Sequence, residues 1–149
     1  MVNKFLKILL LATSPLFVNP ATALEVGDDG LHKTRWMQDT FKDLREDLEE
    51  ANVEGTRLVL FFEQIGCIYC TKMHKEVFSK ENISDYIEDN FFVVQLNLHG
   101  DIEVTDFDGE ILPEKEMARK WGILFTPSII FLPQEVKEDA NAQQAAVAM

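Results

Sequence analysis

Runs of apolar residues mark three buried strands in this chain. They cover Arg57–Glu63, Phe91–Leu98 and Ser128–Leu132, and each run is nearly continuous rather than alternating. Continuous apolar runs are typical of central strands that are covered on both faces of a sheet. Because a helical pattern separates the first two strands, we expect them to pair in parallel through a right-handed crossover. The pattern therefore predicts an α/β fold.

Apolar residues at helical spacing predict the helices that cover this sheet. The first helix is expected to begin at Thr34 and to end within Asn52–Gly55. Its apolar stripe consists of Met37, Phe41, Leu44 and Leu48. Further helices are predicted over Thr71–Ser79, around residues 83–87 and from Pro113 to Gly122.

The remaining segments lack a clear period. Residues 24–33 contain glycines among acidic residues and are predicted to be a flexible leader. Residues 99–112 are acidic, and Asp108-Gly109 predicts the turn of a small protruding hairpin or loop. Residues 134–149 carry no alternating apolar strand and are predicted to be irregular or a frayed helix. Residues 34–133 then form one domain, with 99–112 as an insert.

The N-terminal segment has the pattern of a secretory signal peptide. Lys4 and Lys7 precede an apolar stretch over residues 8–18, and Ala21-Thr22-Ala23 offers the small residues that signal peptidase recognises. The apolar stretch is shorter than the about 20 residues that span a bilayer. We expect cleavage after Ala23, which places the mature chain in the periplasm, where disulfides form. An uncleaved membrane anchor is the alternative.

Net charge narrows the choice of partners. The chain carries a formal charge of −12, and removal of two lysines with the signal peptide leaves about −14. Nucleic acids and anionic membrane surfaces attract clusters of Lys and Arg, so neither is an expected partner. The excess of acidic residues favours solubility, and we expect a monomer.

The only two cysteines of the chain lie three positions apart, as Cys67-Ile68-Tyr69-Cys70. A buried strand precedes them and a helix follows, which is the layout of a thiol–disulfide exchange site. Unpaired backbone N–H groups at a helix start carry partial positive charge. They favour the thiolate, which is the nucleophilic form of cysteine. The three-residue offset puts the two sulfurs within bonding distance.

This layout predicts a dithiol–disulfide cycle. Cys67, exposed at the helix start, is expected to attack a target disulfide, and the less exposed Cys70 to resolve the mixed disulfide. Ile68 and Tyr69 lie between them and are expected to tune the reduction potential. Tyr69 is also expected to lie exposed beside the sulfur, where it touches the target. The two sulfurs carry the electrons, so no separate cofactor is expected.

The order of these features resembles the thioredoxin fold. Besides the cysteine pair after a buried strand, the resemblance rests on Thr126-Pro127 just before the third strand. It implies a three-layer α/β/α sandwich and a cis peptide bond at Thr126–Pro127, in a loop that packs against the disulfide. Pro127 is then expected to present a backbone edge to an extended target peptide. Only 16 residues follow Pro133, so we expect the last edge strand and the C-terminal helix to be missing.

Longer motifs resemble the SoxW family of periplasmic thioredoxin-like proteins of bacterial sulfur-oxidation systems. With the cysteine motif they are Phe62-Glu63-Gln64, Val93-Val94-Gln95-Leu96-Asn97, Val104-Thr105-Asp106-Phe107-Asp108-Gly109-Glu110 and Ala118-Arg119-Lys120-Trp121. The family implies a reductase of protein disulfides that receives electrons from a membrane thiol transporter and passes them to periplasmic Sox proteins. Strong oxidants of the superfamily often carry His between the cysteines, and its absence here favours reduction.

Two nearby side chains are candidate modulators of the site. Cytoplasmic thioredoxins have a buried aspartate six residues before the first cysteine, where this chain has Phe61. Glu63 has the same strand parity and can substitute for it, although a solvated carboxylate at the strand end is the interpretation we favour. His74 lies one turn after Cys70 and is expected to be a surface or packing residue, with modulation of Cys70 as the alternative.

Two other functions stay open. The first is redox chemistry in the opposite direction, as an oxidase or isomerase of folding proteins. The second is a non-redox adaptor or metal-binding module, because Cys67, Cys70 and His74, with His99 as a fourth ligand, suit zinc or copper(I). Structural zinc sites usually bring a second pair of closely spaced ligands, which is missing, so we predict no metal site. The insert has Val104 where a calcium loop needs an acid, so we interpret it as solvated surface or a partner contact.

Overall fold

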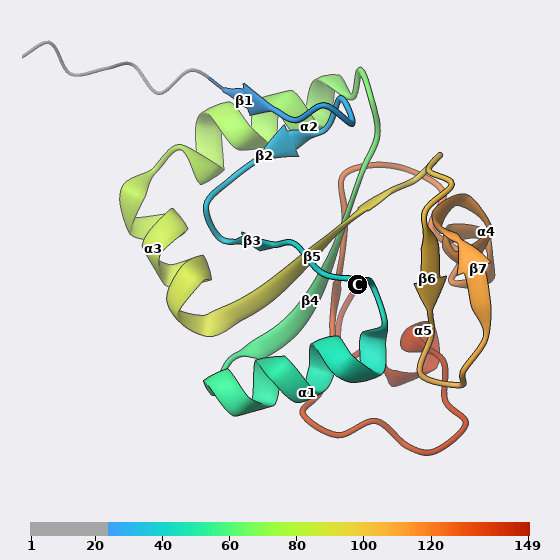
Figure 1. The fold of residues 1–149 in the computed structure, drawn as a ribbon. Coiled ribbons are helices and arrows are strands. Elements are labelled where there is room, and N and C mark those ends of the chain that lie inside the picture. The colour runs from blue at the N-terminus through green and yellow to red at the C-terminus, as the bar shows by residue number, and fades with distance from the viewer. Residues whose placement is uncertain (1–23) are drawn as a thin grey trace, which may run out of the picture.

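A four-stranded mixed sheet lies at the centre of the molecule, seen in a computed structural model that describes residues 24–149 (Figure 1). The predicted signal peptide lies outside the described residues. The strands run in the order β3-β5-β4-β8, with β3 and β4 parallel to β5 and β8 antiparallel to β4. They cover Met37–Gln38 (β3), Arg57–Glu63 (β4), Phe91–Asn97 (β5) and Ser128–Phe131 (β8).

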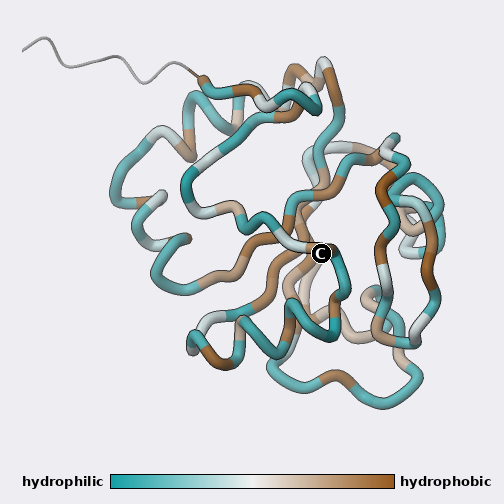
Figure 2. The backbone as a smooth tube through the Cα atoms, in the orientation of Figure 1, coloured by the Kyte–Doolittle hydropathy of each residue, from teal (hydrophilic) through white to brown (hydrophobic). Residues whose placement is uncertain are grey.

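The three strands predicted from apolar runs all occur within one residue of their expected ends. The parallel pairing of β4 with β5 is also confirmed, with Val59 opposite Val93. All five central residues of β4 and of β5 are below one-tenth exposed because helices cover both faces of the sheet, and Ile130 of β8 is also buried. Figure 2 shows these central strands as the most hydrophobic part of the chain.

Alternate residues of β4 face two different layers of helices. Leu58, Leu60 and Phe62 pack in a core cluster with residues of α1 (Leu44–Glu54) and α4 (Glu114–Lys120). Val59 and Phe61 face the other layer. That layer consists of α2 (Ile68–Met73), the π-helical segment η1 (His74–Phe78) and α3 (Glu81–Asn90). The protein is therefore a three-layer α/β/α sandwich.

The predicted flexible leader is wrong, because residues 24–33 form an ordered hairpin. Strand β1 (Glu25–Val26) pairs antiparallel with β2 (His32–Lys33). The turn between them includes Gly30 at φ 75°, a left-handed conformation that glycine adopts without strain. Leu31 and His32 are buried. The hairpin lies beside α2, the helix that begins after Cys67 (Figure 1).

The first helix begins ten residues later than predicted. Lys42 has φ 60°, and Asp43 is extended and caps α1 by accepting a hydrogen bond from the Arg45 backbone N–H. Upstream of this cap, Met37 pairs with Val93 in the sheet instead of extending the helix. Phe41, which the spacing placed in the apolar stripe, is 93% exposed. The cap and the sheet edge therefore override the helical periodicity of residues 34–43.

The acidic insert forms the predicted small hairpin. Strands β6 (Glu103–Thr105) and β7 (Ile111–Pro113) pair antiparallel, with Gly109 at φ 85° in the connecting turn. Its Asp106, however, is fully buried rather than solvated. The Asp106 carboxylate accepts hydrogen bonds from Trp121 Nε1 at 2.7 Å and from the Ala142 backbone N–H at 2.9 Å. The insert is thus anchored to α4 and to the chain end by a buried carboxylate.

The last segment is mostly irregular but packed against the domain. It contains one short helix, α5 (Ala142–Ala145), whose first residue is fully buried. A single antiparallel bridge joins Ala148 to Phe131 of β8, where a further edge strand would lie. Within residues 24–149, no helix has the length and apolar character that a bilayer crossing requires.

Candidate active site

Cys67 and Cys70 form a disulfide at the point where β4 leads into α2. The two sulfurs are 2.09 Å apart and the Cα atoms 5.2 Å apart. Gly66, at φ 74°, turns the chain out of the strand. Cys67 then caps α2, and its Sγ accepts a hydrogen bond from the Cys70 backbone N–H at 3.0 Å. An N–H group of the helix start therefore points at the Cys67 sulfur, as the predicted exchange site requires.

The two cysteines differ in exposure, but less than predicted. Cys67, expected to be exposed, keeps only 5% of its surface accessible, and Cys70 keeps none. The order is as expected, with Cys67 the more accessible. Its low exposure has a local cause, because Thr126 lies against its sulfur and donates a hydrogen bond from Oγ1 to Sγ at 3.2 Å.

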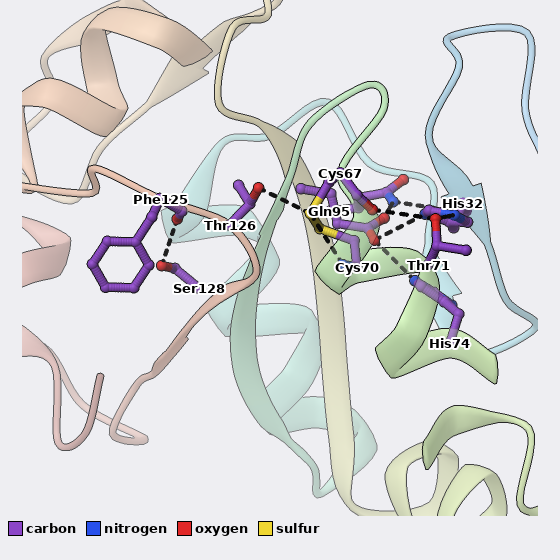
Figure 3. Close-up of a disulfide and its surroundings, with 10 residues drawn as sticks. His32, Cys67, Cys70, Thr71, His74, Gln95, Phe125, Thr126 and Ser128 are labelled. Carbon is purple, nitrogen blue, oxygen red and sulfur yellow. Dashed lines mark hydrogen bonds and ion pairs between the residues drawn. A yellow bond between two sulfur atoms is a disulfide. The ribbon is translucent and has the colours of Figure 1, made fainter. Parts of the chain in front are cut away.

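The loop that carries Thr126 approaches the disulfide from the side opposite to His32, Thr71 and His74 (Figure 3). Its Thr126–Pro127 peptide bond is cis, as the resemblance implies. Ser128 closes the loop by donating a hydrogen bond from Oγ to the Phe125 carbonyl at 2.8 Å. The Phe125 ring points away from the sulfurs (Figure 3).

Exposed apolar side chains lie between the two cysteines and just before Thr126 in the sequence. Ile68 and Tyr69 are 72% and 67% exposed, so Tyr69 lies at the surface as predicted. Leu124 and Phe125, just before Thr126, are 79% and 71% exposed. Large apolar side chains at this exposure are typical of a surface that another molecule covers.

Glu63 is fully buried, so the favoured interpretation of a solvated strand-end carboxylate is wrong. Its Oε1 lies 3.1 Å from His32 Nδ1 and 3.0 Å from His74 Nε2. The other oxygen, Oε2, accepts a hydrogen bond from Gln95 Nε2. A buried carboxylate is stable only when such partners replace water, and this network explains why Glu63 turns inward.

His74 is also buried, with 2% of its surface exposed, which excludes a surface position. Its ring stacks on His32 with centroids 4.5 Å apart and packs edge-on against Phe78. Within residues 24–149, His74 bonds to Glu63 and makes no hydrogen bond with either sulfur. A packing residue within a polar network describes it best.

His32 and Gln95 complete this network, although neither was predicted from the sequence to be a site residue; Gln95 entered only within a motif that resembles the SoxW family. His32 lies in the segment predicted to be flexible, and 31 residues separate it from Glu63. It also lies 3.1 Å from Thr71 Oγ1, and Thr71 in turn donates a hydrogen bond to the Cys67 carbonyl at 3.2 Å. The network thus reaches the cysteine motif through the backbone of Cys67.

The four-ligand set considered for zinc or copper(I) is not assembled. Cys67 and Cys70 are joined to each other, and His74 is paired with Glu63. His99 is exposed in the turn that follows β5, at the start of the insert. Within the described residues, these four side chains therefore do not meet at one point.

The sheet order, the cysteine pair at a helix start and the cis proline beside it define a thioredoxin-fold protein with a dithiol–disulfide pair. The chain belongs to the thioredoxin-like domain family, whose model matches residues 44–142, more than half of its length. The predicted thioredoxin-like α/β fold class is confirmed. No curated protein matches the chain.

Several solved structures are similar. A thioredoxin from Thermus thermophilus, solved in solution, has 26% identity and a TM-score of 0.45, over 60% of this chain and 61% of that one. A thioredoxin-fold protein from Helicobacter pylori has 18% identity and a TM-score of 0.48, over 62% and 57%. A DsbH oxidoreductase has 15% identity and a TM-score of 0.46, over 82% and 81%. The chain spans about three-fifths of the length of the first two.

Proposed function

We propose that this protein is a thiol–disulfide oxidoreductase that reduces protein disulfides. The observation that carries the proposal is the Cys67 sulfur at the start of α2, which accepts hydrogen bonds from the Cys70 N–H and from Thr126 Oγ1. In the reduced protein the same two donors stabilise a thiolate on Cys67. A stabilised thiolate is what nucleophilic attack at neutral pH requires.

The cycle balances electrons between the two cysteines and the target. The Cys67 thiolate attacks one sulfur of the target disulfide, forms a mixed disulfide and releases the other target sulfur as a thiolate. Cys70 then loses its proton and attacks Cys67, which frees the second target thiol. The products are a reduced target and the Cys67–Cys70 disulfide seen in the structure. Two electrons from a dithiol donor must then restore the protein.

The exposed apolar side chains beside the disulfide support a protein substrate. Ile68 and Tyr69, next to Cys67 in the sequence, and Leu124 and Phe125, just before Thr126, offer exposed apolar contacts. The cis-Pro127 loop offers a backbone edge that an extended peptide can pair with. We therefore propose extended segments of proteins around a disulfide as the substrate class.

We further propose that the protein acts in the periplasm, in a sulfur-oxidation pathway. The pattern of residues 1–23 supports export, and the motifs shared with the SoxW family support the pathway. A membrane thiol transporter is the proposed electron donor. The exchange itself uses the two sulfurs and no bound cofactor.

Reduction of insulin disulfides by a dithiol donor tests the enzyme class. Cys67→Ser removes the nucleophile and is expected to lower the catalysed rate to the background of the donor alone. Cys70→Ser keeps the nucleophile but removes the resolving thiol, so it is expected to accumulate a mixed disulfide with the target, detectable by mass spectrometry. Full activity in Cys67→Ser, or mixed disulfides formed by Cys67→Ser instead of Cys70→Ser, would refute the assignment of roles.

A further inference from the structure

Three buried side chains next to the exchange site have no part in the cycle described above. His32 comes from β2, Glu63 from the end of β4 and His74 from the start of η1. All three are below one-tenth exposed. One ligand atom from each lies within 4.8 Å of the other two. Two imidazoles and a carboxylate are a common ligand set for divalent transition metals.

In this cluster the hydrogen-bond donors and acceptors do not match, because one contact joins two acceptors. Thr71 donates its single hydroxyl proton to the Cys67 carbonyl, so the proton between Thr71 and His32 must belong to His32 Nε2. A neutral His32 then has a bare lone pair on Nδ1. That lone pair faces Glu63 Oε1 at 3.1 Å, and a carboxylate oxygen is also an acceptor. Two buried acceptors at this distance need a positive species between them, either a proton or a metal ion.

The spacing of the three atoms suits a small metal ion. His32 Nδ1 and His74 Nε2 lie 3.1 and 3.0 Å from the same Glu63 oxygen. Neighbouring ligands of a tetrahedral zinc ion, each about 2.0–2.1 Å from the metal, are roughly 3.3 Å apart. Ligand movements of a few tenths of an ångström therefore open the cluster enough to admit the ion.

The groups behind these ligands are already held in place. Thr71 accepts from His32 Nε2, and Gln95 Nε2 donates both to Glu63 Oε2 and to the His32 carbonyl, the latter at 2.7 Å. Such outer contacts orient metal ligands and fix the histidine tautomer. These outer contacts occupy His32 Nε2 and Glu63 Oε2, which would not bind the metal. They leave His32 Nδ1 and Glu63 Oε1 facing each other.

Access and local charge also permit an ion to enter. His74 lines a surface cavity together with Thr34, Arg35 and Phe78. The Lys and Arg residues that line this cavity are paired elsewhere: Lys33 with Asp29 and Gln95, and Arg35 with Asp85 and Glu88. Their charges are therefore partly neutralised at the entrance.

We propose that His32 Nδ1, His74 Nε2 and Glu63 Oε1 bind one divalent transition-metal ion of the zinc type. The site is separate from the Cys-x-x-Cys pair and does not depend on thiol chemistry. A bound ion ties the β1–β2 hairpin to the strand and the helical segment that flank the cysteines. This proposal departs from the prediction, made from the sequence, that the protein has no metal site.

Titration of the purified, fully oxidised protein with Zn²⁺ tests the proposal, with Co²⁺ as a spectroscopic probe. Oxidation removes Cys67 and Cys70 as ligands, so any bound ion must use other groups. We expect one equivalent of Zn²⁺ to bind, and Co²⁺ to give the visible absorption of a site with nitrogen and oxygen ligands. Calorimetry should show affinity lowered about 100-fold or more in His32→Gln and in Glu63→Gln.

His99→Gln is the matched control, because His99 is the third histidine of the chain and is exposed. It should bind Zn²⁺ as the unaltered protein does. Should Glu63→Gln fail to fold by circular dichroism, His32→Gln and His74→Gln decide the question. The proposal is overturned if the oxidised protein binds no equivalent of metal, which leaves a proton in the cluster, or if the folded His32 and His74 variants bind as before. Exchange activity plays no part in this readout, so its outcome is independent of the proposed function.

Discussion

The hydroxyl of Thr126 is one of two hydrogen-bond donors that the structure places on the Cys67 sulfur. The other is the Cys70 backbone N–H, which no side-chain substitution removes. Hydrogen bonds to a charged acceptor are stronger than those to a neutral one. The Thr126 bond is therefore expected to matter more to the reduced thiolate than to the disulfide.

Thr126→Val tests this contribution at the scale of one residue, because valine keeps the shape and the β-branch. A net loss of about 0.5–1.5 kcal/mol of thiolate stabilisation corresponds to a roughly two- to thirteenfold slower reaction. We expect that decrease in the alkylation rate of reduced Cys67 at neutral pH. Ser128→Ala is the control, since it removes a hydroxyl of the same loop that bonds to the Phe125 carbonyl and not to sulfur. Equal rates for Thr126→Val and the unaltered protein would contradict this role of the hydroxyl.

Local sequence identified the cysteines, Tyr69 and the Thr126-Pro127 loop, since each lies in a short motif. It did not predict the surroundings of Glu63. The burial of that carboxylate depends on His32 and Gln95, which are 31 and 32 residues away and belong to other strands. A strand-end acid is ordinarily solvated, and only long-range hydrogen bonds make its burial tolerable.

Among the elements, α1 is the helix whose start the apolar periodicity predicts wrongly. The apolar spacing from residue 37 to residue 48 fits one helix, yet Asp43 caps α1 and residues 37–38 pair with β5. Short edge strands of two residues leave no alternating pattern to detect. By contrast, β4, β5 and β8 are predicted well, because long apolar runs are typical of central strands that helices cover on both faces.

The same helix carries an acid whose titration affects stability. Burial raises the pKa of Asp47 from its ordinary value of 3.8 to about 6, partly opposed by a hydrogen bond from Thr40 and assisted by nearby acids such as Asp43. Because the folded-state pKa is the higher one, the folded protein binds a proton more readily than the unfolded chain. This contribution to stability is fully present below about pH 4 and is lost as the pH rises through about 6.

Asp47→Asn is expected to remove this pH dependence. After allowance for partial access of solvent, we expect the free energy of unfolding at pH 7 to rise by about 1 kcal/mol relative to the unaltered protein, with little difference near pH 4. Urea denaturation of both proteins across this range measures it. Glu49→Gln, which alters an exposed acid of the same helix that does not act on Asp47, should keep the original profile. A stability gain that is equal at pH 4 and pH 7 would contradict burial as the cause.

On the scale of the whole molecule, the sheet ends at β8 with one backbone bridge in place of a further strand. On the face beside α2 and α3, Ile129 and Phe131 of β8 are only partly buried. The Asp106 carboxylate joins the insert to Trp121 and to the start of α5. Composition predicted an irregular chain end, but not that a buried acid of the insert would hold it.

Partial burial acts to lower the pKa of Lys120, but hydrogen bonds to Asp108, Glu110 and Asp106 outweigh it and raise the pKa. The insert thereby gathers three of its acids around one cation of α4. This pairing gives the acidic insert a structural role within the domain.

We expect Cys67 and Cys70 to form a reversible two-electron couple poised for reduction of other proteins. Equilibration of the purified protein with defined thiol–disulfide buffers, followed by mass spectrometry of the trapped forms, measures its reduction potential directly. We predict a single two-electron transition at about −270 mV, the value of a reducing thioredoxin. A potential of about −120 mV would assign the protein to oxidation instead. A disulfide that does not exchange with the buffer would contradict any exchange activity of Cys67 and Cys70.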